Sequence, residues 1–179
     1  MLDGGHARRL ELLTGIADDL DRSVASVDRV LGGGPKEDLE LAWMDALVRY
    51  GRCFGKGVPA WGASRILGGL TEILLARHRH FRRLRDALVS HPGGIGRTYR
   101  SEALLDAGNV PHVRCEPIPM FVLGQLEAMD FAELLSTVRE LVGRLRSEVE
   151  NELRFDLAEM SDEQFRQLPL PARLDGNQG

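Results

Sequence analysis

The amino-acid sequence predicts an all-α fold: an up-and-down bundle of four long helices, with a loop or β-hairpin insertion between the third and the fourth. Apolar residues recur at steps of three and four over four separate stretches of the chain, which is the period of amphipathic helices. Clusters of glycine and proline separate these stretches. Four of the eight prolines fall within residues 92–124, where the helical period is lost.

The first helix is expected between residues 10 and 31, where the apolar positions form a heptad pattern suited to packing against other helices. Gly32, Gly33 and Gly34 end it, and Pro35 is suited to the first turn of the next helix. The apolar face consists of Leu10, Leu13, Ala17, Leu20, Val24, Val27 and Leu31.

The second helix is expected to follow Pro35 and to be closed by the glycine- and proline-containing residues 55–59. Its apolar side consists of Leu39, Trp43, Leu47, Tyr50 and Phe54.

The third helix is expected to become regular only near Leu70, because Gly68 and Gly69 weaken its start. It is expected to stop at His91, because Pro92 cannot continue the hydrogen bonding and moves the preceding residue out of the α region. Its apolar stripe consists of Leu67, Leu70, Leu74, Phe81, Leu84 and Leu88.

Residues 92–124 are expected to form the insertion, with two short strands at residues 97–100 and 112–115 around a turn at residues 107–109. The fourth helix is expected to start near Asp130, whose carboxylate can form a capping box with Glu133. Its buried face consists of Phe131, Leu134, Val138, Leu141, Leu145, Val149 and Leu153. We therefore expect one domain over residues 1–168 and a disordered tail over residues 169–179.

Composition excludes several classes of protein. The chain has 179 residues, enough for one domain with a core, and no apolar run approaches the length of a membrane span. The first residues lack the features of a signal peptide, so we expect a cytoplasmic protein with no membrane partner. Cys53 and Cys115 lack the close spacing of metal-binding cysteines, and the net charge of −4 argues against nonspecific coating of nucleic acid.

Positive charge is nevertheless concentrated on the third helix. A single acidic residue, Asp86, interrupts a basic strip that can hold one phosphate-bearing ligand. The alternative is a solvated helix face. The basic strip consists of Arg77, His78, Arg79, His80, Arg82, Arg83, Arg85 and His91. Helical spacing places His78, Arg82 and Arg85 together, on a face different from the apolar stripe.

The segment from Arg85 to His91 combines two functional groups of metal-free RNA cleavage, a guanidinium for phosphate and an imidazole for proton transfer. In a regular helix residues six apart do not share a face. A break at Pro92 would let the imidazole of His91 turn back toward Arg85.

This segment resembles the signature of HEPN domains, in which arginine, a polar residue, a short apolar run and a histidine end a helix. Here Asp86-Ala87-Leu88-Val89-Ser90 separate Arg85 from His91. The residues from His78 to Leu84 and from Tyr50 to Gly55 look like the abortive-infection branch of that group. The resemblance extends over roughly residues 8–155.

The resemblance implies a metal-independent endoribonuclease without a cofactor, of a kind often found as a toxin or antiphage effector. Arg85 would bind the scissile phosphate, His91 would transfer protons, and the ribose 2′-hydroxyl would be the nucleophile. Asp86 would orient Arg85 or the same arginine of a second subunit across a dimer, and His78 and Arg82 would extend the phosphate-binding face. The implied partners are a second copy of the chain, RNA and an antitoxin or another protein.

Alternatives stay open at each position. Asp86 is equally consistent with a surface residue, and His91 with a histidine that caps its own helix. Gly93 stands where some HEPN toxins carry a modified tyrosine, which puts that form of control in doubt. The same residues also suit a catalytically inactive module that dimerises and binds a nucleotide, RNA or protein. A third alternative is a bundle with no nucleic-acid role.

Two further patterns give weak signals. His78 and His80 lie two apart, which is a poor spacing for a metal pair on a helix. The glycine-rich residues 93–97 lack the lysine and hydroxyl residue of a phosphate-binding loop, so a flexible turn is the simpler interpretation.

Overall fold

The computed structural model describes residues 4–89, 97–105, 111–119, 124–161 and 163. Their helices confirm the predicted all-α class, although these residues contain five helices where four were expected. Within the described residues, no helix has the length and apolar character needed to cross a lipid bilayer. The elements are α1 (Gly4–Gly32), α2 (Lys36–Arg52), α3 (Ala60–Gly68), α4 (Glu72–Val89), β1 (Arg97–Leu105), β2 (Pro111–Pro119) and α5 (Gln125–Ala158).

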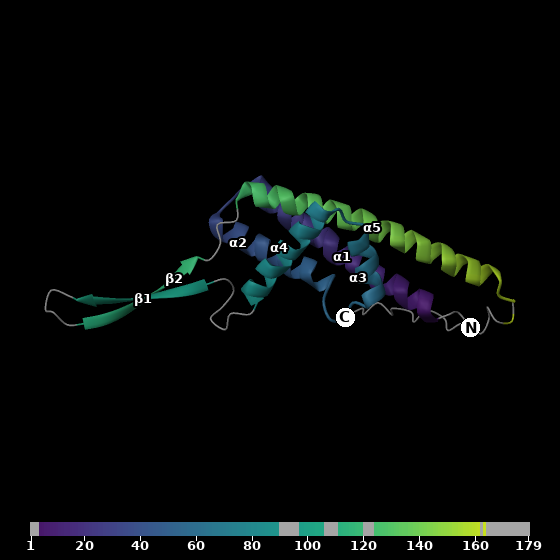
Figure 1. Cartoon of the computed structure of the whole chain (residues 1–179), viewed down its shortest axis with the longest axis horizontal. Coiled ribbons are helices and arrows are strands. Elements are labelled where there is room, and N and C mark those ends of the chain that lie inside the picture. Colours follow the sequence, from purple (N-terminus) through teal and green to yellow (C-terminus); the bar gives the residue numbers. More distant parts are fainter. Residues whose placement is uncertain (1–3, 90–96, 106–110, 120–123, 162, 164–179) are drawn as a thin grey trace, which may run out of the picture.

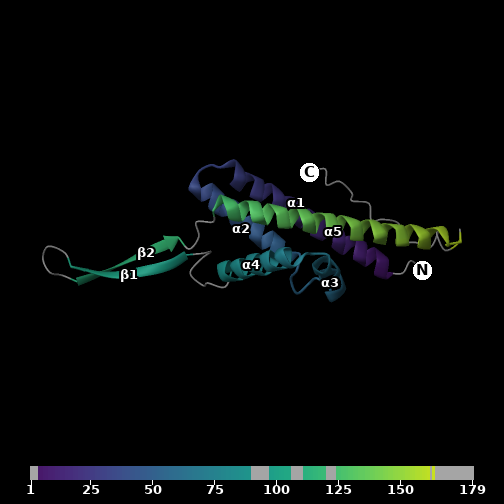
Figure 2. The same ribbon diagram turned by 45° about the horizontal axis from the view of Figure 1, so that its top comes forward.

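The first and last helices pair along the long axis of the molecule (Figure 1). His6 near the start of α1 contacts Asp156 near the end of α5 at 2.8 Å, and Asp21 of α1 contacts Arg139 of α5 at 2.7 Å. The two helices are therefore antiparallel. In Figure 2, α4 lies to one side of this pair, and α3 lies beyond α4 at the end away from the hairpin.

The core of α1 follows the predicted apolar pattern. Leu13, Leu20 and Val27 are almost completely buried. Ser23 lies between them on the same face, and its hydroxyl donates a 2.8 Å hydrogen bond to the carbonyl of Ala46 in α2. This bond satisfies a polar group that burial would otherwise destabilise.

Aromatic side chains join α2, α4 and α5. Phe131 of α5 lies 4.3 Å from Phe81 of α4, 5.6 Å from Trp43 and 5.2 Å from Tyr50 of α2, measured between ring centroids. The Tyr50 ring meets Phe131 edge to face, a favourable arrangement for aromatic pairs. The cluster fixes α4 on α2 and thereby positions the candidate site.

α4 begins at Glu72, close to the predicted start near Leu70, whereas the separate helix α3 was not predicted. α3 ends at Gly68, and the hydroxyl of Thr71 accepts a 3.3 Å hydrogen bond from the backbone N–H of Leu74 at the start of α4. That bond is typical of a helix N-cap. A Cβ atom at Gly69 would lie 2.5 Å from Leu141 of α5, so the chain turns in close contact with α5.

The start of α5 also differs from the prediction. The helix begins at Gln125, and the N–H of Gly124 donates a 3.1 Å hydrogen bond to the carboxylate of Glu127. Asp130 and Glu133 do not form the expected capping box, because both lie within the helix and pair with Arg77 of α4. The Arg77–Asp130 ion pair measures 2.6 Å.

β1 and β2 form an antiparallel hairpin that extends away from the helices (Figure 1). Arg97 pairs with Pro119 at one end and Leu105 with Pro111 at the other, so both strands are longer than the sequence suggested. The predicted helix end at His91 and Pro92 and the predicted tail at residues 169–179 lie outside the described residues.

Candidate functional site

The basic strip does not form a single face in the folded chain. Arg77 and His80 turn toward α5, where His80 lies 3.7 Å from Glu127 and Arg77 pairs with two carboxylates. Arg82 and Arg85 turn toward α2. The charges are therefore divided between two neighbouring helices, each of which supplies groups that bind them.

His78 is buried, which corrects the expectation that it projects outward with Arg82 and Arg85. Only 5% of the residue is exposed, and its Nδ1 lies 2.7 Å from the hydroxyl of Tyr50. Burial, with a smaller contribution from the positive charges of Arg82 and Arg79, lowers the pKa of His78 to about 4. The imidazole is therefore neutral at pH 7, and its tautomer sets whether Tyr50 donates to Nδ1 or Nδ1–H donates to the Tyr50 oxygen.

Arg82 and Arg85 bind the C-terminal end of α2. Arg82 Nη1 donates to the carbonyl of Phe54 at 3.3 Å, and Arg85 Nη2 donates to the carbonyl of Gly51 at 3.2 Å. The last carbonyls of a helix lack partners within the helix and carry partial negative charge, so arginines are favourable there. The last turn of α2 thus holds Arg85 in place, and the turn that follows α2 holds Arg82.

Asp86 lies beside Arg85 as the sequence suggested. Its Oδ1 is 2.8 Å from Arg85 Nη1, while the Asp86 side chain is 53% exposed and that of Arg85 is 23% exposed. The Arg85 guanidinium therefore has one anchor on each terminal nitrogen, Gly51 on Nη2 and Asp86 on Nη1. Each of these nitrogens carries a further N–H that can bind phosphate.

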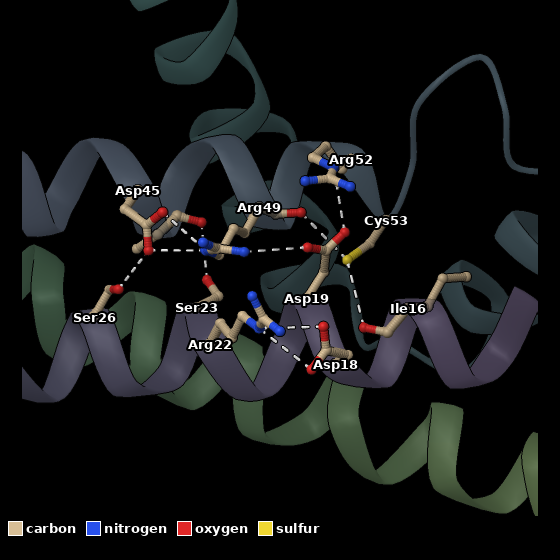
Figure 3. Close-up of polar contacts among 11 residues, drawn as sticks. Ile16, Asp18, Asp19, Arg22, Ser23, Ser26, Asp45, Arg49, Arg52 and Cys53 are labelled. Carbon is tan, nitrogen blue, oxygen red and sulfur yellow. Dashed lines mark hydrogen bonds and ion pairs between the residues drawn. The ribbon is translucent and has the colours of Figure 1, made fainter. Parts of the chain in front are cut away.

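The end of α2 is itself fixed by a polar cluster between α1 and α2 (Figure 3). Asp19 of α1 receives Arg49 Nη1 at 3.5 Å and Arg52 Nε at 3.3 Å. Arg49 also contacts Asp45 at 2.8 Å, and Ser26 donates to Asp45 at 2.7 Å. Burial opposes ionisation of Asp45, but the hydrogen bonds from Arg49 and Ser26 outweigh it and lower the pKa of Asp45.

Cys53 follows α2 and lies inside this junction rather than in a reactive setting. Its thiol contacts the carbonyl of Ile16 at 3.8 Å and that of Arg49 at 3.4 Å. Burial raises the pKa of Cys53 to about 12, with a smaller contribution from Asp19. The thiol is therefore protonated at neutral pH and a poor nucleophile.

His91 lies outside the described residues, so the structure does not test its proximity to Arg85. In the described part of the chain, no three His, Cys, Asp or Glu side chains are grouped so that they could hold a metal ion. What this part of the structure supplies is a guanidinium with two fixed anchors near the end of α4.

Sequence reasoning missed the contribution of Gly51. The backbone at this residue both binds Arg85 and approaches it closely, and a Cβ atom there would overlap Arg85 Nε. The available signal was a glycine within α2 next to Tyr50 on the buried side, where helix propensity alone favours alanine.

Comparisons of the chain with known protein families, with curated proteins and with solved structures find no match.

Proposed function

We propose that the chain is a metal-independent endoribonuclease of the HEPN type that acts as a homodimer. The observation that carries the proposal is the Arg85 guanidinium, held between Gly51 and Asp86 with donors left for a phosphate. Arg85 stands near the C-terminal end of α4, shortly before His91 in the sequence. The resemblance of this segment to the HEPN signature supplies the roles of both residues.

In the proposed reaction the ribose 2′-hydroxyl attacks the adjacent phosphate and the bond to the 5′-oxygen breaks. His91 exchanges a proton with the 2′-hydroxyl or the leaving oxygen, a contribution worth about 10²–10⁴-fold in rate. Arg85 stabilises the negative charge that grows on the phosphate, and Asp86 orients Arg85. The products are a 2′,3′-cyclic phosphate end and a 5′-hydroxyl end.

An exposed apolar face of α2 bears on the choice of partner. Leu41 and Val48 are 60% and 40% exposed and lie seven residues apart, on one face of α2. This apolar face supports a second copy of the chain as partner, as the resemblance implies. We further propose that the activity belongs to a toxin or antiphage effector, restrained by an antitoxin or another protein.

The test is cleavage of labelled single-stranded RNA by purified protein in the presence of EDTA. We expect the wild type to cleave, and Arg85→Ala and His91→Ala to reduce cleavage to a small residual rate while the protein remains folded. Arg83→Ala is the matched control, because Arg83 is an exposed arginine of the same helix and bonds only to the Arg79 carbonyl among the described contacts. Light scattering of the same samples measures the dimer.

An Arg85→Ala variant that cleaves RNA as fast as the wild type contradicts the proposal. Loss of wild-type cleavage when EDTA is added also contradicts it. A specific observation favours a second candidate, a catalytically inactive module that dimerises and binds a nucleotide, RNA or protein. Arg85 binds the last turn of α2 and Arg82 binds the turn that follows it, which is a structural task that requires no catalysis. A folded wild type that binds RNA without cleaving it supports this second candidate.

A further inference from the structure

The side chain of Arg85 crosses α2 at Gly51, which has no side chain of its own. A Cβ atom built on Gly51 would overlap Arg85 Nε and lie 2.9 Å from Nη2 and 3.0 Å from Cζ. Any residue other than glycine at this position therefore displaces the guanidinium. Gly51 is buried, so a methyl group has no open space into which it can turn.

The conformation of Arg85 carries a local cost beside its two anchors. Its Nε is buried, and among the described residues it has no hydrogen-bond partner. An unpaired buried donor is destabilising, and a long arginine side chain can avoid that cost by extending into water. A glycine within a helix is also less stable than alanine. Two local costs thus coincide at one contact, a pattern typical of functional positions.

We infer that Gly51 is a positioning residue for Arg85, an inference that rests on the proposed ribonuclease function. The missing side chain lets Nη2 reach the Gly51 carbonyl while Nη1 reaches Asp86, so the guanidinium is oriented before RNA binds. The N–H groups left on Nη1 and Nη2 then face a phosphodiester without reorganisation.

The first experiment compares Gly51→Ala with Gly143→Ala in single-turnover cleavage of RNA with EDTA present. Gly143 lies within α5, and no atom is within 4 Å of a Cβ built there, so the same substitution has no contact to disturb. We expect Gly51→Ala to lower the cleavage rate about 10- to 100-fold, as small misplacements of catalytic groups do. RNA affinity should change less than the rate, and Gly143→Ala should match the wild type.

A double variant tests whether the effect passes through Arg85. In an Arg85→Ala background, Gly51→Ala should cause no further loss of residual cleavage, because the displaced group is already absent. An additional loss overturns the inference, as does a Gly51→Ala variant that cleaves like Gly143→Ala. If Gly51→Ala alone fails to fold, the double variant should still fold, because removal of the Arg85 side chain leaves room for the methyl group. A double variant that fails to fold contradicts the claim that the methyl group added at Gly51 disturbs only Arg85.

A spectroscopic measurement separates this inference from the proposed function. In the wild type, the NMR signal of the buried Arg85 Nε–H should exchange slowly with water, and in Gly51→Ala it should exchange faster. Unchanged protection in Gly51→Ala overturns the positioning role even if the wild type cleaves RNA. A wild type that leaves RNA intact while the signal responds as expected overturns the ribonuclease function, and the role of Gly51 in catalysis with it.

Discussion

His78 and Tyr50 form a buried pair that makes the stability of the fold depend on pH. The imidazole is held neutral against Tyr50 of α2 and Phe54 of the turn that follows it, whose rings lie 5.8 Å and 4.6 Å from it. Its neighbours Arg82 and Arg79 further oppose protonation. In the unfolded chain the same imidazole has an ordinary pKa near 6.5.

We predict that the folded chain loses stability as the pH falls from about 6.5 to about 4. Because the folded pKa of His78 is about 4, the unfolded chain binds one more proton within this window. The free energy of unfolding should fall by about 1.4 kcal/mol per pH unit there and should be insensitive to His78 above it. Urea unfolding at several pH values measures the slope.

The matched variant for this prediction is Tyr50→Phe/His78→Phe, which replaces both partners with apolar rings and leaves neither polar group unpaired. Its slope between pH 4 and 6.5 should be smaller than that of the wild type by the His78 contribution. His6 and His80 are present in both proteins, so their titration cancels in the difference. Equal slopes in the two proteins would show that His78 is not the group responsible.

At this scale, helical spacing predicted correctly which side chains lie near one another, but it predicted wrongly that His78 faces outward. Helical spacing places His78, Arg82 and Arg85 near one another, and the structure agrees. Spacing does not reveal that α2 covers this face, so the burial of His78 beneath Phe54 and Tyr50 could not be predicted. Whether a polar side chain is exposed depends on neighbours that are distant in sequence.

Among the elements, the corner between α3 and α4 shows why the separate helix α3 was not predicted. The apolar stripe continues through Leu67, Leu70 and Leu74 at helical spacing, and Leu70 and Leu74 are buried. Periodicity therefore persists across a break in the backbone. The break itself depends on Gly69, which lets the chain approach Leu141 of α5.

We predict opposite effects for alanine at the two adjacent glycines of this corner. Gly68→Ala should raise the free energy of unfolding by about 0.5–1 kcal/mol, because no atom lies within 4 Å of a Cβ there and alanine restricts the unfolded chain. Gly69→Ala should lower it by about 1–3 kcal/mol through overpacking against Leu141. Urea unfolding curves measure both.

Leu141→Ala provides the control for the corner. In that background the added methyl group at Gly69 has space, so Gly69→Ala should lose most of its cost. The prediction is wrong if Gly68→Ala and Gly69→Ala shift the unfolding midpoint equally, or if the cost at Gly69 persists without the Leu141 side chain.

The start of α5 shows a related limit of sequence patterns. Asp130 and Glu133 have the spacing of a capping box, and the same spacing places both carboxylates on one side of a helix. The structure uses the second property, since both bind Arg77. The same spacing can therefore form either a helix cap or a pair of ionic contacts, and the position of α4 determines which of the two forms.

In the whole molecule, the helices and the hairpin are separate contributions to the fold. β1 and β2 pair with each other, and Figure 1 shows the hairpin apart from the helices. α4 and α5 run antiparallel where His80 faces Glu127, so the end of α4 and the start of α5 lie at the same end of the bundle. The hairpin extends from that end (Figure 1).

We predict that the helices fold without the hairpin. Residues 93–123 would be replaced by about eight glycine and serine residues, which span about 16 Å as a flexible chain. His91 is kept. The free energy of unfolding should change by no more than about 1 kcal/mol, because loop-closure entropy depends weakly on loop length. Circular dichroism and urea unfolding measure the helix content and cooperativity.

Loss of cooperative unfolding in that variant would show that the hairpin belongs to the folding unit. Its RNA cleavage, compared with the full chain under the same conditions, reports separately whether the hairpin contributes to substrate binding. An intact fold with weaker RNA binding would assign the hairpin to the substrate rather than to the core.

The antiparallel pairing of α1 with α5 also has a consequence for folding during synthesis. α1 leaves the ribosome before α5, which covers much of its apolar face and is translated only after α2, α3, α4 and the hairpin. At about 5–20 residues per second, α1 waits several seconds or longer for its partner. A nascent chain therefore cannot complete its core before α5 has emerged, which gives chaperones or a protein partner an interval in which to bind.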